Sequence, residues 1–281
     1  MPDITHGIAP LELSALVLAA LLTIGLLAGV TGGLLGVGGS IVMIPALTEV
    51  LGPNQHLYQA AAMIVNFFVV VPAVVQHRRA GAIDRVSVAR LIPPAAIAVV
   101  VGVLISELDV FAGGGERHLR GLFGLFLLGV CVTDLYRLVR PPPGTPDQAS
   151  ARPRAGWRFA AAVAVPTGLV AGMLGVGGGV LAVPLQRRWL GVPIRRAIAN
   201  SATIIVATSV IGAGLKNYAL ITTHGYRLQA VIIAATLAPT AIIGSLVGSR
   251  LTHRLPIRHV KIAFLVLLAV AAVRLTYRAR M

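Results

Sequence analysis

Long runs of uncharged, apolar residues make up most of the chain, with short polar stretches between them. No charged residue falls between Glu12 and Glu49, or between Arg227 and Arg250. An uncharged apolar run of about 18 residues or more is long enough to cross the hydrocarbon core of a bilayer as a helix. Several such runs in one chain predict an all-α, polytopic membrane protein that is embedded in the lipid bilayer.

The apolar runs form two sets of five segments, joined by a polar linker. They span about 13–33, 40–51, 57–77, 90–106 and 119–139 in the first set, and 159–174, 179–190, 197–216, 228–250 and 260–278 in the second. The linker is rich in Pro, Gly, Ser and Arg, as exposed connections are. We therefore expect a first transmembrane repeat at 1–139, a cytoplasmic linker at 140–158 and a second transmembrane repeat at 159–281.

The two sets share a glycine motif. "GGLLGVGGSIVMIP" at 32–45 is repeated almost residue for residue as "AGMLGVGGGVLAVP" at 171–184. A second match, Arg117-His118 with Arg258-His259, lies near the ends of the two sets. Matching at both ends of each set predicts an internal duplication.

The basic residues predict how the repeats are oriented. The chain has 24 Lys and Arg, and 17 of them fall in the loops 78–90, 137–158, 187–196 and 250–261. Lys and Arg collect in cytoplasmic loops, so we expect the N-terminus outside the cell membrane and the linker in the cytoplasm. The second repeat then begins on the opposite side from the first, which makes the two an inverted repeat. The three arginines in 274–281 disagree with this assignment, since it places them outside.

The same bias explains the formal net charge of +15. A strongly basic chain can indicate a nucleic-acid partner, but loop topology accounts for this charge, and we expect no nucleic acid. The N-terminal 12 residues contain no basic residue ahead of the first apolar run. That is unlike a cleaved signal peptide, so the first segment is expected to be retained.

The glycine motifs predict two breaks in membrane helices. Adjacent glycines weaken a helix and leave backbone N–H groups without helical partners. Such a break is tolerated at membrane depth only where protein or a water-filled cavity surrounds it. The segments 40–51 and 179–190 are also short, at about 18 Å of helix against a core of about 30 Å. They are either full spans or re-entrant helices, and we expect the breaks to meet near the midplane.

Backbone amides at such a break can bind an anion. A short helix is expected to begin near Ser40 and another near Gly179, with free N–H groups at the positive end of each helix dipole. Ser40 adds a hydroxyl donor or only caps its helix. Pro45 and Pro184 fall in the second turns and are expected to kink the helices. Close helix packing by small residues, as at Gly29 and Gly244, is the alternative explanation for the glycines.

These segments resemble a known family. The paired "GxxGxGGGxxxxP" pattern, "HRRAGAID" at 77–84 and "GSLVGSRLTHRLP" at 244–256 are similar to the TauE/SafE sulfite exporter family of membrane transporters. The resemblance covers about residues 13–278. It implies a secondary transporter or exporter of small, sulfur-containing anions, such as sulfite, thiosulfate, sulfonates or related organic acids. It also implies alternating access between the two halves.

The sequence departs from the family where that family often has a Thr-Ser pair. Here the corresponding positions are Val65-Asn66 and Asn200-Ser201, polar groups that either face the site or join neighbouring helices. The candidate substrate-binding residues are therefore Gly36, Gly38, Gly39, Ser40, Pro45, Asn66, Gly175, Gly177, Gly178, Gly179, Pro184, Asn200 and Ser201.

Other functions receive less support. None of the nine acidic residues lies at the centre of an apolar run, so we expect no carboxylate proton relay. No histidine lies at membrane depth in an apolar run either, since the histidines are in loops or at segment edges, so we expect no enzyme activity. We also expect no catalytic residue, cofactor or metal site, since the one cysteine, Cys131, excludes a multi-cysteine site. An anion channel or a non-transporting accessory subunit remains the alternative, and a homo-oligomer stays open.

Overall fold

The described part of the chain folds almost entirely into helices. The computed structural model describes residues 14–111, 115–139, 156–225 and 228–252, together with Leu265 and Ala269. Its elements are α1 (Ala15–Leu35), α2 (Ser40–Leu51), α3 (Gln55–Arg79), α4 (Arg85–Ser106), the 3₁₀ turn η1 (Asp109–Phe111), α5 (Glu116–Val139), α6 (Trp157–Leu174), α7 (Gly179–Leu185), the π-helix η3 (Gln186–Leu190), α8 (Ile194–Thr222) and α9 (Gln229–Leu251). No strand occurs in these ranges, which confirms the predicted all-α class.

The predicted apolar segments correspond closely to these helices. In the described part of the chain, six helices are long and apolar enough to cross a membrane, namely α1, α3, α4, α6, α8 and α9. The short segments are helices of their own: α2 has 12 residues, and α7 has 7 before η3 continues it. The predicted linker at 140–158 falls almost wholly outside the described residues, and so does most of the segment 260–278.

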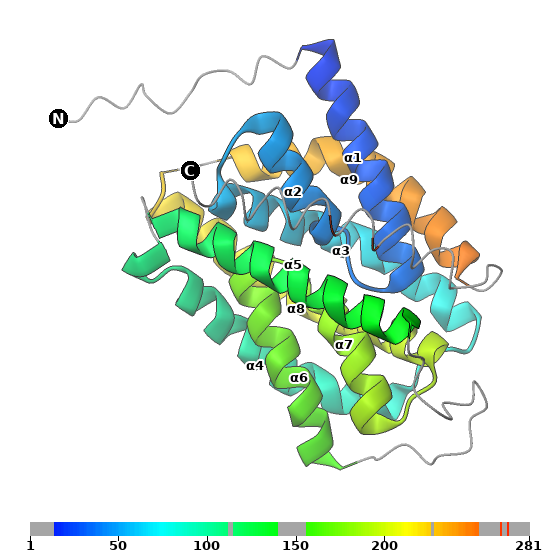
Figure 1. Ribbon diagram of the computed structural model, residues 1–281. Coiled ribbons are helices and arrows are strands. Elements are labelled where there is room, and N and C mark those ends of the chain that lie inside the picture. The colour runs from blue at the N-terminus through cyan, green and yellow to red at the C-terminus, as the bar shows by residue number, and fades with distance from the viewer. Residues whose placement is uncertain are drawn as a thin grey trace.

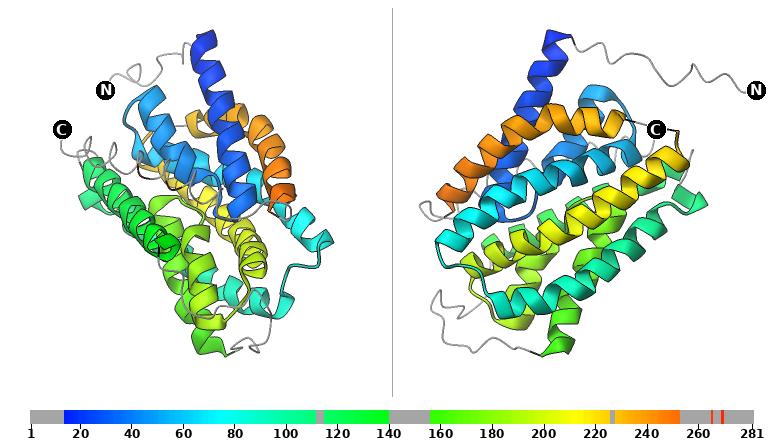
Figure 2. Two further views of the ribbon diagram at one scale, coloured as in Figure 1. Left: turned by 45° about the vertical axis from the view of Figure 1, so that its right-hand side comes forward. Right: turned by 180° about the vertical axis from the view of Figure 1, so that it is seen from behind.

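The long helices of the two halves alternate in space. Seen from behind, α9, α3, α8 and α4 lie side by side in a row (Figure 2). At the ends of the row α1 packs against α9, and α6 packs against α4. Each neighbour in the series α1, α9, α3, α8, α4 and α6 therefore comes from the other half of the chain. Figure 1 shows α2, α5 and α7 on the opposite face. The inverted orientation of the halves stays a prediction.

Glycines bring the outer helix pairs together. A Cβ on Gly29 of α1 would overlap the backbone carbonyl of Ala241 in α9, and one on Gly172 of α6 would overlap that of Val99 in α4. Gly244 of α9 likewise faces the Leu26 carbonyl of α1. Small residues permit this backbone approach in membrane helices. The packing role predicted for Gly29 and Gly244 is confirmed.

The outward faces of the helices are apolar. Ile97 and Leu104 of α4 are 69% and 62% exposed, and Leu125 of α5 is 62% exposed. Surfaces of this kind, spread over several long helices, suit hydrocarbon rather than water. The fold is therefore that of a multi-pass membrane protein.

Candidate functional site

The two glycine motifs meet inside the molecule. Helix α1 ends at Gly36, where φ is +64°, and α6 ends at Gly175, where φ is +71°. A Cβ on Gly179 would lie 2.5 Å from Val37 Cα and would overlap the Gly36 carbonyl oxygen. The motifs therefore touch backbone to backbone, and only glycine fits at Gly179.

Asn66 of α3 occupies the break in the first motif. Its Oδ1 accepts hydrogen bonds from the backbone N–H groups of Gly39, at 2.9 Å, and Ser40, at 3.2 Å. Its Nδ2 donates to Ser40 Oγ at 3.1 Å. Both side chains are fully buried. The carboxamide thus caps the N-terminus of α2. Asn66, a predicted site residue, therefore acts at the first motif both as a hydrogen-bond acceptor and as a donor.

The second motif has no such cap. The residue in α8 that corresponds to Asn66, at the spacing that separates Gly36 from Gly175, is Ile205. The correspondence of Val65-Asn66 with Asn200-Ser201 that was expected from the sequence is therefore wrong, because Gly38 faces Asn66 as Gly177 faces Ile205. A Cβ on Gly177 would lie 3.2 Å from Ile205 Cγ2 and 3.0 Å from Asn66 Nδ2. Within the described ranges, the backbone N–H groups of Gly178 and Gly179 have no hydrogen-bond acceptor.

Hydroxyl groups of α8 bind carbonyls of both motifs. Ser201 Oγ donates to the Gly36 carbonyl at 2.9 Å, and Thr208 Oγ1 lies 3.4 Å from the Gly177 carbonyl. Both side chains are fully buried. Ser201, a predicted site residue, therefore belongs to the region where the motifs meet, and Thr208 is an addition that the sequence analysis did not include.

The structure does not bring Asn200 to the motifs. Its Oδ1 accepts from the Asp84 backbone N–H at 2.9 Å, and its Nδ2 donates to Gln186 Oε1 at 3.1 Å. Asn200 thus ties the connection between α3 and α4 to the start of η3. Adjacent residues of a helix point in different directions, which explains why Ser201 reaches the motifs when Asn200 does not.

The prolines also lie within the short helices. Pro45 is a buried residue of α2, and Pro184 is the residue before last of α7, which the π-helix η3 follows from Gln186. A proline removes one backbone donor and disturbs the helical ladder, in keeping with the irregular turn that follows Pro184. The predicted kinks at both positions stay predictions.

A buried lysine lies near the second motif. Lys216 of α8 is 1% exposed, and its Nζ lies 2.8 Å from Gln59 Oε1, 2.6 Å from Ser106 Oγ and 3.2 Å from Glu107 Oε1. Gln59 in turn packs on Gly175, whose added Cβ would lie 2.8 Å from Gln59 Cβ. Gln59 therefore links the buried Lys216 to the second motif.

The predicted apolar segment 197–216 ends at Lys216, and this end is too early. Helix α8 continues to Thr222, so Lys216 lies inside a helix. The apolar residues that follow it, in "NYALIT", were the signal that could have shown this. A lysine at such a position is buried only because Glu107 and two polar side chains pair with it.

Glu107 follows α4 directly. Burial raises the pKa of this carboxyl group, but its interactions with His56, Lys216 and His224 outweigh burial and lower the pKa to about 2. Glu107 therefore stays ionised at neutral pH, as the counter-charge to Lys216.

The family profile described as "Sulfite exporter TauE/SafE" matches residues 21–275. The chain belongs to this family. It is similar to the "Probable membrane transporter protein MamO" of Paramagnetospirillum magneticum, with 28% identity over 92% of this chain and 44% of that protein. It is also similar to the "Probable membrane transporter protein YunE" of Bacillus subtilis, with 22% identity over 92% of this chain and 96% of that protein.

A further relative is a "Probable membrane transporter protein" of Methanocaldococcus jannaschii, with 25% identity over 88% of this chain and 91% of that protein. The chain spans less than half the length of the two MamO proteins it matches.

Proposed function

We propose that this TauE/SafE protein is a secondary transporter of small anions in the cell membrane, with sulfite, thiosulfate, sulfonates and related organic acids as candidate substrates. In this proposal the N-terminus lies outside, the linker at 140–158 is cytoplasmic, and the two inverted halves give alternating access. The observation that carries the proposal is the meeting of the two glycine motifs around Asn66 and Ser201.

The polar groups there suit an oxyanion. The site region contains hydroxyls, a carboxamide and backbone N–H groups, and glycine lets a ligand approach the main chain closely. Because Asn66 already accepts from Gly39 and Ser40, the second motif is the better place for the anion. Its Gly178 and Gly179 amides have no acceptor among the described residues.

Flux into liposomes tests the proposal. Purified protein is reconstituted, and uptake of labelled sulfite, thiosulfate, a sulfonate and a carboxylate is measured. Saturable counter-exchange of one anion indicates a carrier, because the binding site of a carrier returns across the membrane with a second anion bound. A steady anion current without saturation would indicate a channel, and no flux of any anion would indicate an accessory subunit.

Asn66→Asp gives the sharpest variant. The change keeps an acceptor for Gly39 and Ser40 but places a negative charge where the motifs meet, so we expect anion uptake to fall by about 10-fold or more. Asn217→Asp is the matched control, because it adds the same charge to α8 at a residue whose carboxamide donates to the Ala213 carbonyl of its own helix. Equal uptake by the two variants would show that the transported anion does not pass the glycine motifs.

A further inference from the structure

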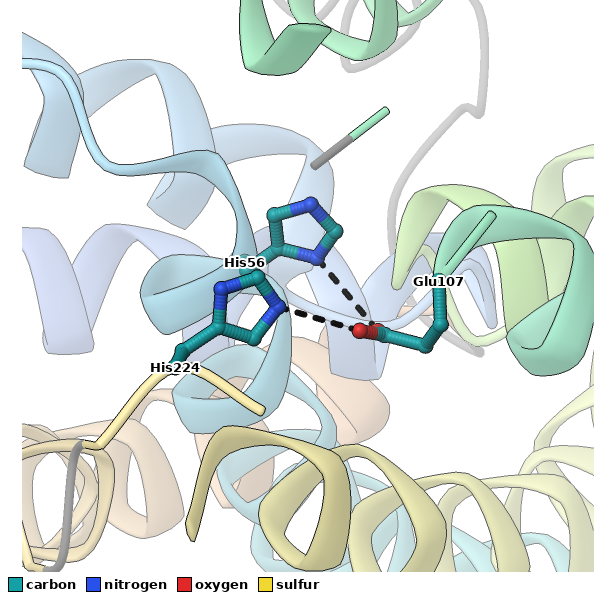
Figure 3. Close-up of side chains that lie close together, drawn as sticks. All are labelled: His56, Glu107 and His224. Atoms are coloured by element: carbon teal, nitrogen blue, oxygen red, sulfur yellow. Dashed lines mark hydrogen bonds and ion pairs between the residues drawn. The ribbon is translucent and has the colours of Figure 1, made fainter. Parts of the chain in front are cut away.

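Two histidines and a carboxylate converge at one end of the helix row. His56 lies in the first turn of α3, Glu107 follows α4 and His224 follows α8. His56 Nδ1 lies 3.4 Å from Glu107 Oε1, and His224 Nε2 lies 3.1 Å from Glu107 Oε2. Figure 3 shows both rings directed at the carboxylate, and their centroids are 4.5 Å apart. Three segments distant in sequence thus supply three ligand atoms, all within 4.8 Å of one another.

His56 is oriented as a metal ligand is. Its Nε2 lies 3.0 Å from the Phe111 backbone carbonyl, which can only accept, so Nε2 carries a hydrogen. Metal-binding histidines commonly fix their tautomer in this way, by donating the other ring N–H to a carbonyl. Neutral His56 then presents the lone pair of Nδ1 to Glu107. This buried nitrogen makes no hydrogen bond in the structure.

Two acceptors that face each other need a cation between them. Either Nδ1 is protonated, and His56 is an imidazolium, or a metal ion joins it to Glu107. The ion-pair alternative would place His56, His224 and Lys216 around a single carboxylate. The 3.4 Å between His56 Nδ1 and Glu107 Oε1 favours a metal, because ligands about 2.0–2.2 Å from a tetrahedral ion lie about 3.3–3.6 Å apart. His224 Nε2, at 3.1 Å from Oε2, would have to move outward by a few tenths of an ångström to join them.

We propose that His56, Glu107 and His224 bind one divalent transition-metal ion, with Zn²⁺ as the best-matched probe. Two imidazoles and one carboxylate form a donor set that zinc accepts, with a fourth position left for water. Lys216 does not block the site, because a carboxylate offers about four lone pairs and Lys216 takes one. Glu107 and His224 are 15% and 13% exposed, so an ion can reach the site from solvent.

The bound ion would hold together the ends of α3, α4 and α8 beside Lys216. Gln59, which Lys216 bonds, also packs on Gly175. Metal binding would therefore fix the end of the bundle that supports the second glycine motif. This proposal does not depend on anion transport.

Zinc titration of the tag-free, chelator-treated full chain in detergent tests it. We expect the wild-type chain to bind one Zn²⁺. The variant His224→Ala should bind zinc about 10-fold more weakly or worse, as is usual when a metal ligand or its supporting group is lost. His118→Ala is the control, because His118 is an exposed histidine of α5; it should bind as the wild type does. No zinc binding by the wild type, or equal binding by His224→Ala, would overturn the proposal.

X-ray absorption at the zinc edge covers the case in which His224→Ala fails to fold. The wild type alone should show nitrogen and oxygen ligands at about 2.0–2.2 Å, including two imidazoles. Zinc with six oxygen neighbours, or with one imidazole, would contradict the site.

Discussion

The two glycine motifs have nearly the same sequence but different hydrogen bonding. In the first, Gly39 has φ −86°, and its N–H donates to Asn66. In the second, the corresponding Gly178 has φ +80°, and its N–H has no acceptor among the described residues. The facing residues differ accordingly, because α3 supplies Asn66 where α8 supplies Ile205. A repeated motif therefore does not imply a repeated role, since its surroundings decide which backbone groups remain available.

The next position differs as well. Ser40 begins α2, and its hydroxyl accepts from Asn66 Nδ2. Gly179 begins α7 and lies directly against Gly36 and Val37 of the first motif. The first motif has room for a side chain there because its contact partner is a carboxamide. The second has none because its contact partner is backbone.

Gly179→Ser, which would make the second motif match the first, should have the largest effect. The new Cβ would overlap the Gly36 carbonyl oxygen and approach Val37 Cα. Overpacking of this kind costs about 3 kcal/mol or more where backbone cannot yield. We expect poor folding yield and no transport. The reverse change, Ser40→Gly, should fold, because it removes a small CH₂OH side chain and adds no atom to the packed region. Both variants are compared by size-exclusion profile and flux. If Gly179→Ser folds and transports normally, the motifs do not meet as described.

Ile205→Asn should have the next largest effect, on transport more than on folding. An asparagine at this position can cap the second motif as Asn66 caps the first, and so compete with an anion for the Gly178 and Gly179 amides. We expect anion uptake to fall by about 10-fold while thermal unfolding in detergent shifts modestly, since a buried amide that finds partners costs little.

Ile205→Val is its control, because it removes one methylene without adding a polar group and should cost about 1 kcal/mol. Uptake by Ile205→Asn equal to that of Ile205→Val would show that the anion does not use these amides.

The sequence alone predicted the helices and part of the candidate site. The lengths of the uncharged apolar runs located the spans, and the paired glycines located the starts of α2 and α7 at Ser40 and Gly179. Polar residues inside apolar runs, Asn66 and Ser201, were identified by the same reasoning. These signals are local, because chain length and side-chain polarity are properties of single segments.

The missed features depend on contacts between distant segments. Whether Asn66 or Asn200 reaches a motif depends on the rotation of each helix, which a hydrophobic run with apolar residues on all sides does not specify. The predicted segment 197–216 was ended at Lys216 because a charge normally ends a span. Its partner Glu107 lies 109 positions earlier in the chain, and no local pattern joins them.

Ser201→Ala should have the smallest effect and tests the bond between the halves. The Ser201 hydroxyl donates to the Gly36 carbonyl, whereas the first half has Ala62 at the corresponding place. Loss of one neutral hydrogen bond costs about 1 kcal/mol, measured by unfolding in mixed detergent with tryptophan fluorescence. Ser209→Ala is the control, because this buried hydroxyl bonds the Val206 carbonyl of its own helix. If the two variants lose the same stability, the hydroxyl of Ser201 contributes no more across the halves than Ser209 does within one helix, and backbone contact at Gly179 alone holds the motifs together.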